Sequence, residues 1–185
     1  MYSKNTIKFV FTFTIFLLSI SFSKQSAHCN ELAENDNCEF YEKCVESNSF
    51  CGSTGYAMGF ATPNCLKYIT NIEKFSAANG QKFIKDSMKC LKKVLLPFRE
   101  EKNCGEIMSV GLKNESQCYF ESGLCNIIKD TANNNLNDFV KGLLAVDKIV
   151  NFRDTNRIQA FIEASDNCDR EDFNRFIDML QMYTD

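Results

Sequence analysis

The chain is poor in histidine and proline, with one histidine and two prolines among 185 residues. A catalytic site that pairs a nucleophile with a histidine would have to use His28, which stands beside Cys29 close to the expected start of the mature chain. That position is unsuited to a packed active site, so we predict no catalytic residue and no enzyme activity. The small number of prolines places few hard breaks along the chain, which favours helices.

The chain also lacks an excess of positive charge. Its 21 Lys and Arg residues face 24 Asp and Glu residues, which gives a formal net charge of −3 at pH 7. Binding to a nucleic acid depends on basic residues that neutralise phosphates. We therefore predict no nucleic-acid partner.

Only one apolar run is a candidate for a leader or a membrane anchor, and it lies at the N-terminus. Two lysines precede an uncharged stretch over residues 9–22, and the small residue Ser23 follows it. This order is typical of a secretory signal peptide. We therefore predict a signal peptide over residues 1–23, a secreted mature chain over residues 24–185 and no transmembrane segment after cleavage. Cleavage near Ala27 and an uncleaved anchor are the alternatives.

Closely spaced cysteine pairs are absent, although ten cysteines follow the predicted leader. Structural zinc sites need pairs such as C-x2-C with histidines nearby, whereas at least five residues separate any two cysteines here. An even number of cysteines in an exported chain indicates a disulfide framework, so we predict no metal site and no cofactor. Spacing alone does not decide which cysteines pair. The cysteines are Cys29, Cys38, Cys44, Cys51, Cys65, Cys90, Cys104, Cys118, Cys125 and Cys168.

Apolar residues recur at helical spacing along most of the chain. The clearest stripe contains Ile84, Met88 and Leu91, and Pro97 is a natural end for that helix. Residues 104–124 are expected to form one continuous helix. We predict a single all-α, disulfide-rich domain. The stripes lie within residues 66–75, 84–95, 104–124, 136–146, 158–162 and 173–180.

Lysines gather on the predicted helix around residue 88, largely on the side away from its apolar stripe. We interpret this side as a solvated helix face. A patch for anionic partners such as sulfated glycans is the alternative. The lysines are Lys82, Lys85, Lys89, Lys92 and Lys93.

Three stretches of the sequence are similar to parts of one family of secreted proteins. The run GQKFIKDSMKC over residues 80–90 is similar to a family helix of the form G-x-x-F-V/I-K-E/D-S-L/M-K-C. The run QCYFESGLCNIIKD over residues 117–130 is similar to a C-Y-x5-C-x-I-x-K pattern, and Cys168 with Asp169 matches a late cysteine and acidic residue. With the order of the early cysteines, these stretches show that the chain resembles the stanniocalcins over roughly residues 29–172.

The resemblance implies both a function and a pairing of the cysteines. The implied function is that of a secreted, hormone-like regulatory glycoprotein with a part in calcium and phosphate homeostasis. Its partner would be an extracellular protein or receptor that the sequence does not identify. The implied pairs are Cys29 with Cys44, Cys38 with Cys65, Cys51 with Cys104, Cys90 with Cys118, and Cys125 with Cys168.

The chain departs from the family pattern at two points. The further C-terminal cysteine that joins two chains in vertebrate members has no counterpart after Cys168, so only a non-covalent homodimer stays open. The early glycosylation sequon of the family fails at Asn48, which is followed by Ser and Phe. The sequon present in this chain is Asn114-Glu115-Ser116, and we predict a glycan on Asn114.

Two other functions fit a small secreted helical protein. One is a carrier that holds a small apolar ligand between its helices, and the other is an inhibitor of a secreted protease. A calcium site is also suggested by an acidic group, but the order of ligands in an EF-hand is absent, so we interpret the group as the start of a helix. Its members are Asp166, Asp169, Glu171 and Asp172.

Overall fold

A computed structural model describes residues 27–100, 103–130, 134–147 and 158–184 of the chain. Within these ranges every regular element is a helix, which confirms the predicted all-α, disulfide-rich fold. The predicted signal peptide over residues 1–23 lies outside the described residues. None of the described helices combines the length and the apolar character needed to cross a membrane.

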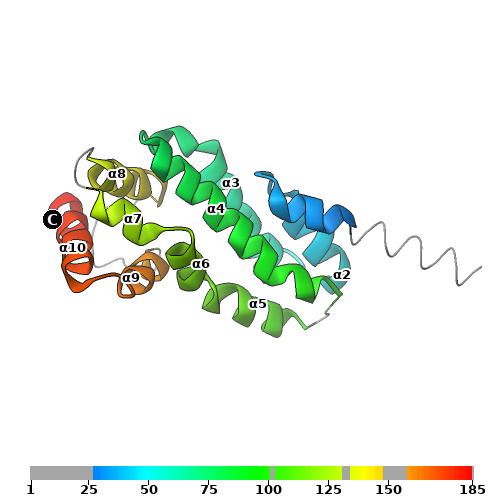
Figure 1. Cartoon of the computed structure of the whole chain (residues 1–185). Coiled ribbons are helices and arrows are strands. Elements are labelled where there is room, and N and C mark those ends of the chain that lie inside the picture. The colour runs from blue at the N-terminus through cyan, green and yellow to red at the C-terminus, as the bar shows by residue number, and fades with distance from the viewer. Residues whose placement is uncertain (1–26, 101–102, 131–133, 148–157, 185) are drawn as a thin grey trace, which may run out of the picture.

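The helices and their order along the chain can be followed in Figure 1. A helix over residues 27–34 comes first. It is followed by η1 (Tyr41–Glu46), α2 (Ser47–Ser49), η2 (Tyr56–Ala61), α3 (Thr62–Thr70), η3 (Ile72–Lys74), α4 (Ala78–Leu95) and η4 (Leu96–Glu100). The remaining elements are α5 (Cys104–Lys113), α6 (Glu115–Glu121), α7 (Leu124–Lys129), α8 (Asn135–Asp147), α9 (Gln159–Ser165) and α10 (Arg170–Thr184).

Helix α4 is the axis of the molecule, because it packs against α3, α5, α6, α7 and α8. In Figure 1 it runs through the middle of the ribbon, between α3 and α6. Its apolar stripe is buried as expected, since Ile84, Met88, Leu91 and Leu95 are each no more than 7 % exposed. Burial of this stripe against several neighbours stabilises the helix.

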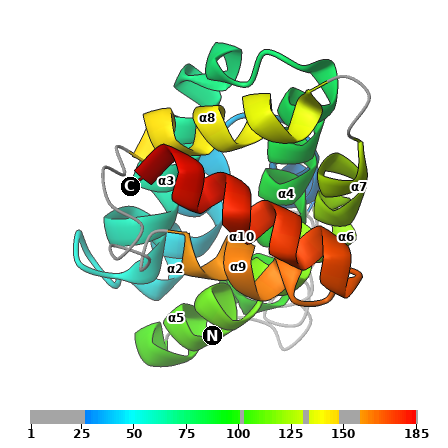
Figure 2. The ribbon, with the colours of Figure 1, turned by 90° about the vertical axis from the view of Figure 1, so that its left-hand side faces the viewer.

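Aromatic rings fill the space between α4 and the C-terminal helices. Phe83 of α4 meets Phe139 of α8 edge to face, with 5.2 Å between ring centroids. Tyr119 of α6 stacks on Phe161 of α9 at 4.2 Å, and Phe75 reaches Phe139 from the segment before α4. Helix α10 lies across α8 and α9 and closes this end of the molecule (Figure 2). The rings therefore join helices that are far apart in the sequence.

The expectation of one continuous helix over residues 104–124 is wrong. Helix α5 ends at Lys113 and α6 begins at Glu115. A second break follows at Gly123, where φ is +95°. A right-handed helix does not continue through a residue with positive φ, and glycine adopts this conformation without steric cost. Gly123 therefore turns the chain from α6 into α7.

The predicted solvated lysine face of α4 needs correction at Lys92, whose side chain is fully buried. Its ammonium group donates hydrogen bonds to the backbone carbonyls of Leu32, Asn35 and Asn37. These carbonyls lie at the end of the helix over residues 27–34 and in the turn after it. The last carbonyls of a helix have no partner within the helix and attract cations. Lys92 therefore fastens the N-terminal helix to α4.

The neighbouring lysines hold the same segment at the surface. Lys85 and Lys89 both pair with Asp36, at 3.1 and 3.4 Å. Lys93 pairs with Glu34 at 2.8 Å. The lysine side of α4 is thus the surface on which the N-terminal helix docks.

Substitution of Lys92 by methionine should destabilise the protein. The Lys92→Met variant leaves one buried and two partly buried carbonyls without their donor, which should lower the free energy of unfolding by about 3 kcal/mol. Lys93→Met removes one half-exposed ion pair and should cost less than about 1 kcal/mol. Denaturant unfolding of the two variants measures both values. Equal losses would contradict the role assigned to Lys92.

Candidate functional site

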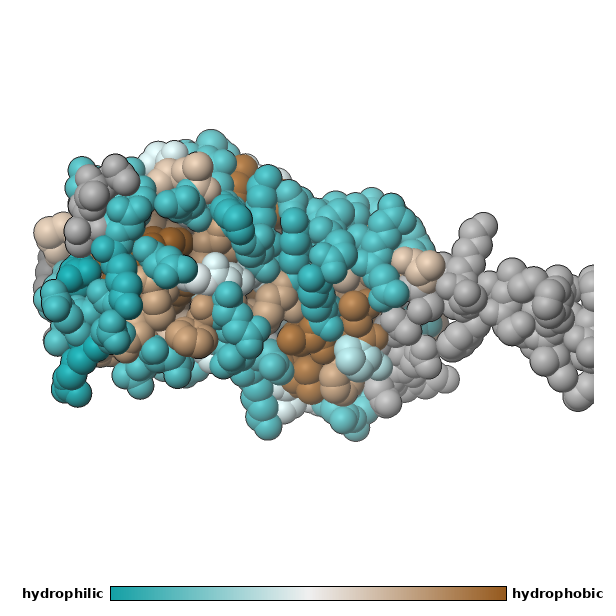
Figure 3. Space-filling model, viewed as in Figure 1, coloured by the Kyte–Doolittle hydropathy of each residue, from teal (hydrophilic) through white to brown (hydrophobic). Residues whose placement is uncertain are grey.

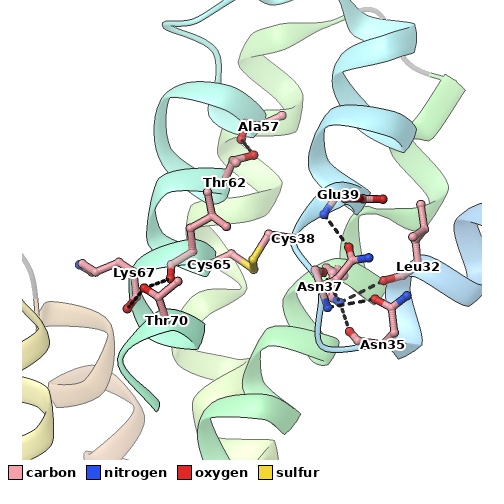
Figure 4. Close-up of a disulfide and its surroundings, with 12 residues drawn as sticks. Leu32, Asn35, Asn37, Cys38, Glu39, Ala57, Thr62, Cys65, Lys67 and Thr70 are labelled. Atoms are coloured by element: carbon pink, nitrogen blue, oxygen red, sulfur yellow. Dashed lines mark hydrogen bonds between the residues drawn. A yellow bond between two sulfur atoms is a disulfide. The ribbon is translucent and has the colours of Figure 1, made fainter. Parts of the chain in front are cut away.

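All ten cysteines are paired, and the pairs are the ones that the resemblance implies. The Cα–Cα distances across the bridges lie between 5.5 and 5.8 Å, within the usual range. Figure 4 shows the bridge from Cys38 to Cys65 of α3, with Leu32, Asn35 and Asn37 nearby. The pairs are Cys29–Cys44, Cys38–Cys65, Cys51–Cys104, Cys90–Cys118 and Cys125–Cys168.

The longer bridges join elements that are distant in the sequence. Cys90–Cys118 ties α4 to α6, and Cys125–Cys168 ties α7 to the turn before α10. Cys51–Cys104 joins the segment after α2 to the start of α5 across 53 residues. A loop of that length restricts the unfolded chain by about 4 kcal/mol in the chain-entropy model. The bridges therefore fix the relative positions of the surface elements.

Asn114, the predicted glycan acceptor, lies half-buried between α5 and α6. Its side-chain nitrogen donates a hydrogen bond to the carbonyl of Val110 at 2.8 Å. An amide nitrogen carries two hydrogens, so one can be replaced by a glycan while the other keeps this bond. The local geometry is compatible with glycosylation.

Exposed apolar side chains gather close to this junction. Met108 and Leu112 on α5 and Phe120 on α6 are 37–46 % exposed. In Figure 3 apolar surface, drawn in brown, is concentrated at the lower right, over the region of α5 and the end of α4. This is an apolar part of the exterior that a protein partner can contact.

The acidic residues near the C-terminus pair with basic side chains. Lys129 of α7 lies 2.9 Å from Asp169. Arg175 lies 2.9 Å from Glu171 and 3.1 Å from Asp172. Across the described ranges, no group of three His, Cys, Asp or Glu side chains is placed to hold a metal ion. These acidic residues instead fasten α10 to α7 and order its first turn.

A pocket of about 380 Å³ lies among four of the six tyrosines of the chain. Tyr41 comes from η1, Tyr56 from η2, Tyr68 from α3 and Tyr119 from α6. Glu115, at the start of α6, contributes a carboxyl group to the wall. The sequence does not predict this site, because no spacing pattern links residues from so many separate helices.

Two contacts fix the tyrosines in the wall. The ring of Tyr56 lies against α5 at Gly111, where a Cβ atom would come within 2.1 Å of the ring carbon Cζ. On another side, the Tyr68 hydroxyl donates to Asp147 at 2.5 Å, and Lys67 pairs with the same carboxylate. The pocket is therefore built from side chains that packing and hydrogen bonds hold in place.

Burial controls the protonation of this pocket. It raises the pKa of Glu115 to about 7, and the negative charge of Glu163 adds to the effect. Burial also raises the pKa of each of the four tyrosines, with a further contribution from the charge of Glu115. Within the described part of the chain, no hydrogen bond or ion pair reaches the Glu115 carboxyl group. Among the described residues Glu115 therefore has no partner, and its raised pKa lies near neutral pH.

The fold and its bridges define a small, disulfide-linked helical protein. The family model described as "Stanniocalcin family" matches residues 17–171, which include all ten cysteines and Asn114. The chain belongs to the stanniocalcin family. No curated protein and no solved structure gives a significant match.

Replacement of Glu115 by glutamine should stabilise the protein above neutral pH. The pKa of Glu115 is 4.5 without the fold and about 7 within it, so the folded state binds more protons between these values. The contribution of Glu115 to the free energy of unfolding therefore falls as the pH rises from about 4.5 to 7. Glu115→Gln should raise the free energy of unfolding by about 2 kcal/mol at pH 8 and change it little at pH 4.

Denaturant unfolding at the two pH values measures this difference. Glu115→Gln keeps the Asn114 sequon, because that motif accepts glutamine at its middle position. Glu73→Gln, at an exposed position in η3, is the matched control and should show no such pH dependence. An equal effect of Glu115→Gln at both pH values would disprove the assignment.

Proposed function

We propose that the protein is a secreted, hormone-like regulatory glycoprotein that acts through its exterior on an extracellular protein partner. Membership of the stanniocalcin family supports this function. The observation that carries it is the pairing of all ten cysteines, because structural disulfides persist in oxidising compartments and are rare in the cytosol. A cross-linked exterior also loses little conformational entropy when a partner binds.

The proposal includes the processing of the chain. Residues 1–23 are a signal peptide that is removed on export, residues 24–185 are the mature chain, and Asn114 carries a glycan. The exterior carries the activity in place of a catalytic site. Because each cysteine already has an intrachain partner, any homodimer would be non-covalent.

Cells that express the full chain should release it into the medium with an N-terminus near residue 24. Peptide mapping without reduction should recover the five bridges, and Asn114→Gln should remove a glycan that Asn48→Gln leaves in place. A chain without residues 1–23 is the control and should stay inside the cells with reduced cysteines. Retention of the full chain inside the cells, or ten free thiols in the released protein, would contradict the proposal.

A part in calcium and phosphate homeostasis should be measurable on epithelial cell layers. The purified protein should change the uptake of labelled calcium or phosphate, because the resemblance to the stanniocalcins implies a part in the balance of these ions. Reduced and alkylated protein is the matched control, since loss of the bridges should unfold the exterior and abolish the response. Equal responses to native and reduced protein, or none to either, would argue against this role.

A further inference from the structure

The pocket among the tyrosines is a partly open site that the proposed hormone role does not use. Its wall is formed by η1, η2, α3 and α6, with Met88 and Leu91 of α4 and Ala160 of α9 between them. A volume of about 380 Å³ falls within the range of small-molecule sites, which extends from about 300 to 1,000 Å³. The pocket is therefore large enough for a small organic ligand.

The carboxyl group of Glu115 is the polar group in this wall that most requires a partner. A buried carboxylate without a hydrogen bond or counter-ion destabilises the folded state. In the described structure its charged neighbours do not supply one, since Glu163 repels it and Lys67 is held by Asp147. A cation inside the pocket would supply the counter-ion that the Glu115 carboxylate lacks.

The tyrosines add a second feature that favours a cation. The hydroxyl groups of Tyr41, Tyr56 and Tyr119 make no hydrogen bond with any described residue, and their oxygens can accept from an ammonium group or from a polar substituent beside it. All four tyrosine hydroxyls lie within electrostatic range of Glu115. Aromatic rings also attract cations through their negative faces. Acceptor oxygens, rings and one acid thus converge on the same space.

We propose that this pocket binds a small organic ammonium ion, with Glu115 as its counter-ion and the tyrosines as its surrounding wall. A divalent metal ion fits less well, because such ions take several oxygen ligands and the described residues of the wall offer a single unpaired carboxylate. An anion fits less well again, because Lys67, the basic residue among the described residues of the wall, is already neutralised by Asp147.

The proposed binding depends on pH through Glu115. The ionisable groups of the wall beside Glu115 are Tyr41 from η1, Tyr56 from η2, Lys67 and Tyr68 from α3 and Tyr119 from α6. Glu163 of α9 acts on Glu115, and Asp147 of α8 acts on Tyr68 and Tyr119. The tyrosines stay neutral because burial raises their pKa values. Ionised Glu115 attracts the cation and protonated Glu115 does not, so affinity should fall about tenfold between pH 8 and pH 6.

Choline and its neutral carbon analogue 3,3-dimethyl-1-butanol are matched probes, because they share a shape and differ in charge. Titration calorimetry on the secreted protein at pH 8 should show choline binding at least about tenfold tighter than the alcohol. Glu115→Gln should weaken choline binding at least about tenfold and leave the alcohol unchanged, while Glu73→Gln should alter neither. Because Glu115→Gln is expected to fold stably, a loss of choline binding by this variant would reflect the missing carboxylate and not unfolding.

Fluorescence gives an independent reading of the location. The chain has no tryptophan, so tyrosine dominates its emission, and choline should change this emission with the same midpoint as the calorimetric titration. The Asn114→Gln protein, which lacks the neighbouring glycan, is titrated in parallel to show whether that glycan affects binding. The proposal is overturned if neither protein binds choline up to about 50 mM. Equal binding of choline and the alcohol, or unchanged binding by Glu115→Gln, would overturn it as well.

Discussion

Covalent cross-linking is the constraint on which the rest of this structure depends. Apart from the 18 residues of α4, many of the helices are short, and α6 and α7 have seven and six residues. Helices of such length are marginal in water and need tertiary contacts. The Cys90–Cys118 bridge holds α6 against α4, and Cys125–Cys168 holds α7 against the start of α10. These bridges limit the distances between the helices, and the aromatic rings of the core stack between the same helices.

Ionisable groups in the interior differ in whether they have partners. Lys92 is surrounded by backbone carbonyls, and Asp147 receives Tyr68 and Lys67, so both groups are buried with partners. Glu115 is the contrasting case, because its carboxyl group is largely buried among tyrosines without a described partner. A departure from a rule that the same molecule obeys elsewhere is a physical reason to look for a ligand. Glu115 therefore marks a candidate ligand site that is separate from the cross-linked exterior.

The sequence predicted what depends on local periodicity and missed what depends on the meeting of distant segments. The stripe through Ile84 and Met88 marked α4 because it repeats at helical spacing. The same periodicity placed Lys92 on the polar side, and its burial follows only from the position of the N-terminal helix. Gly123 falls within the helix expected over residues 104–124, and its positive φ became visible only in the fold. The pairing of the cysteines came from family resemblance, since spacing allows many pairings.

The contact between Gly111 and Tyr56 has a consequence for the evolution of the chain. Because any side chain at position 111 would occupy the space of the Tyr56 ring, the two positions are not independent. Relatives that carry a larger residue at the first position should carry a smaller one at the second, and their cavity should differ in shape. Paired substitution at these two positions would thus distinguish relatives that keep this pocket from relatives in which its shape differs.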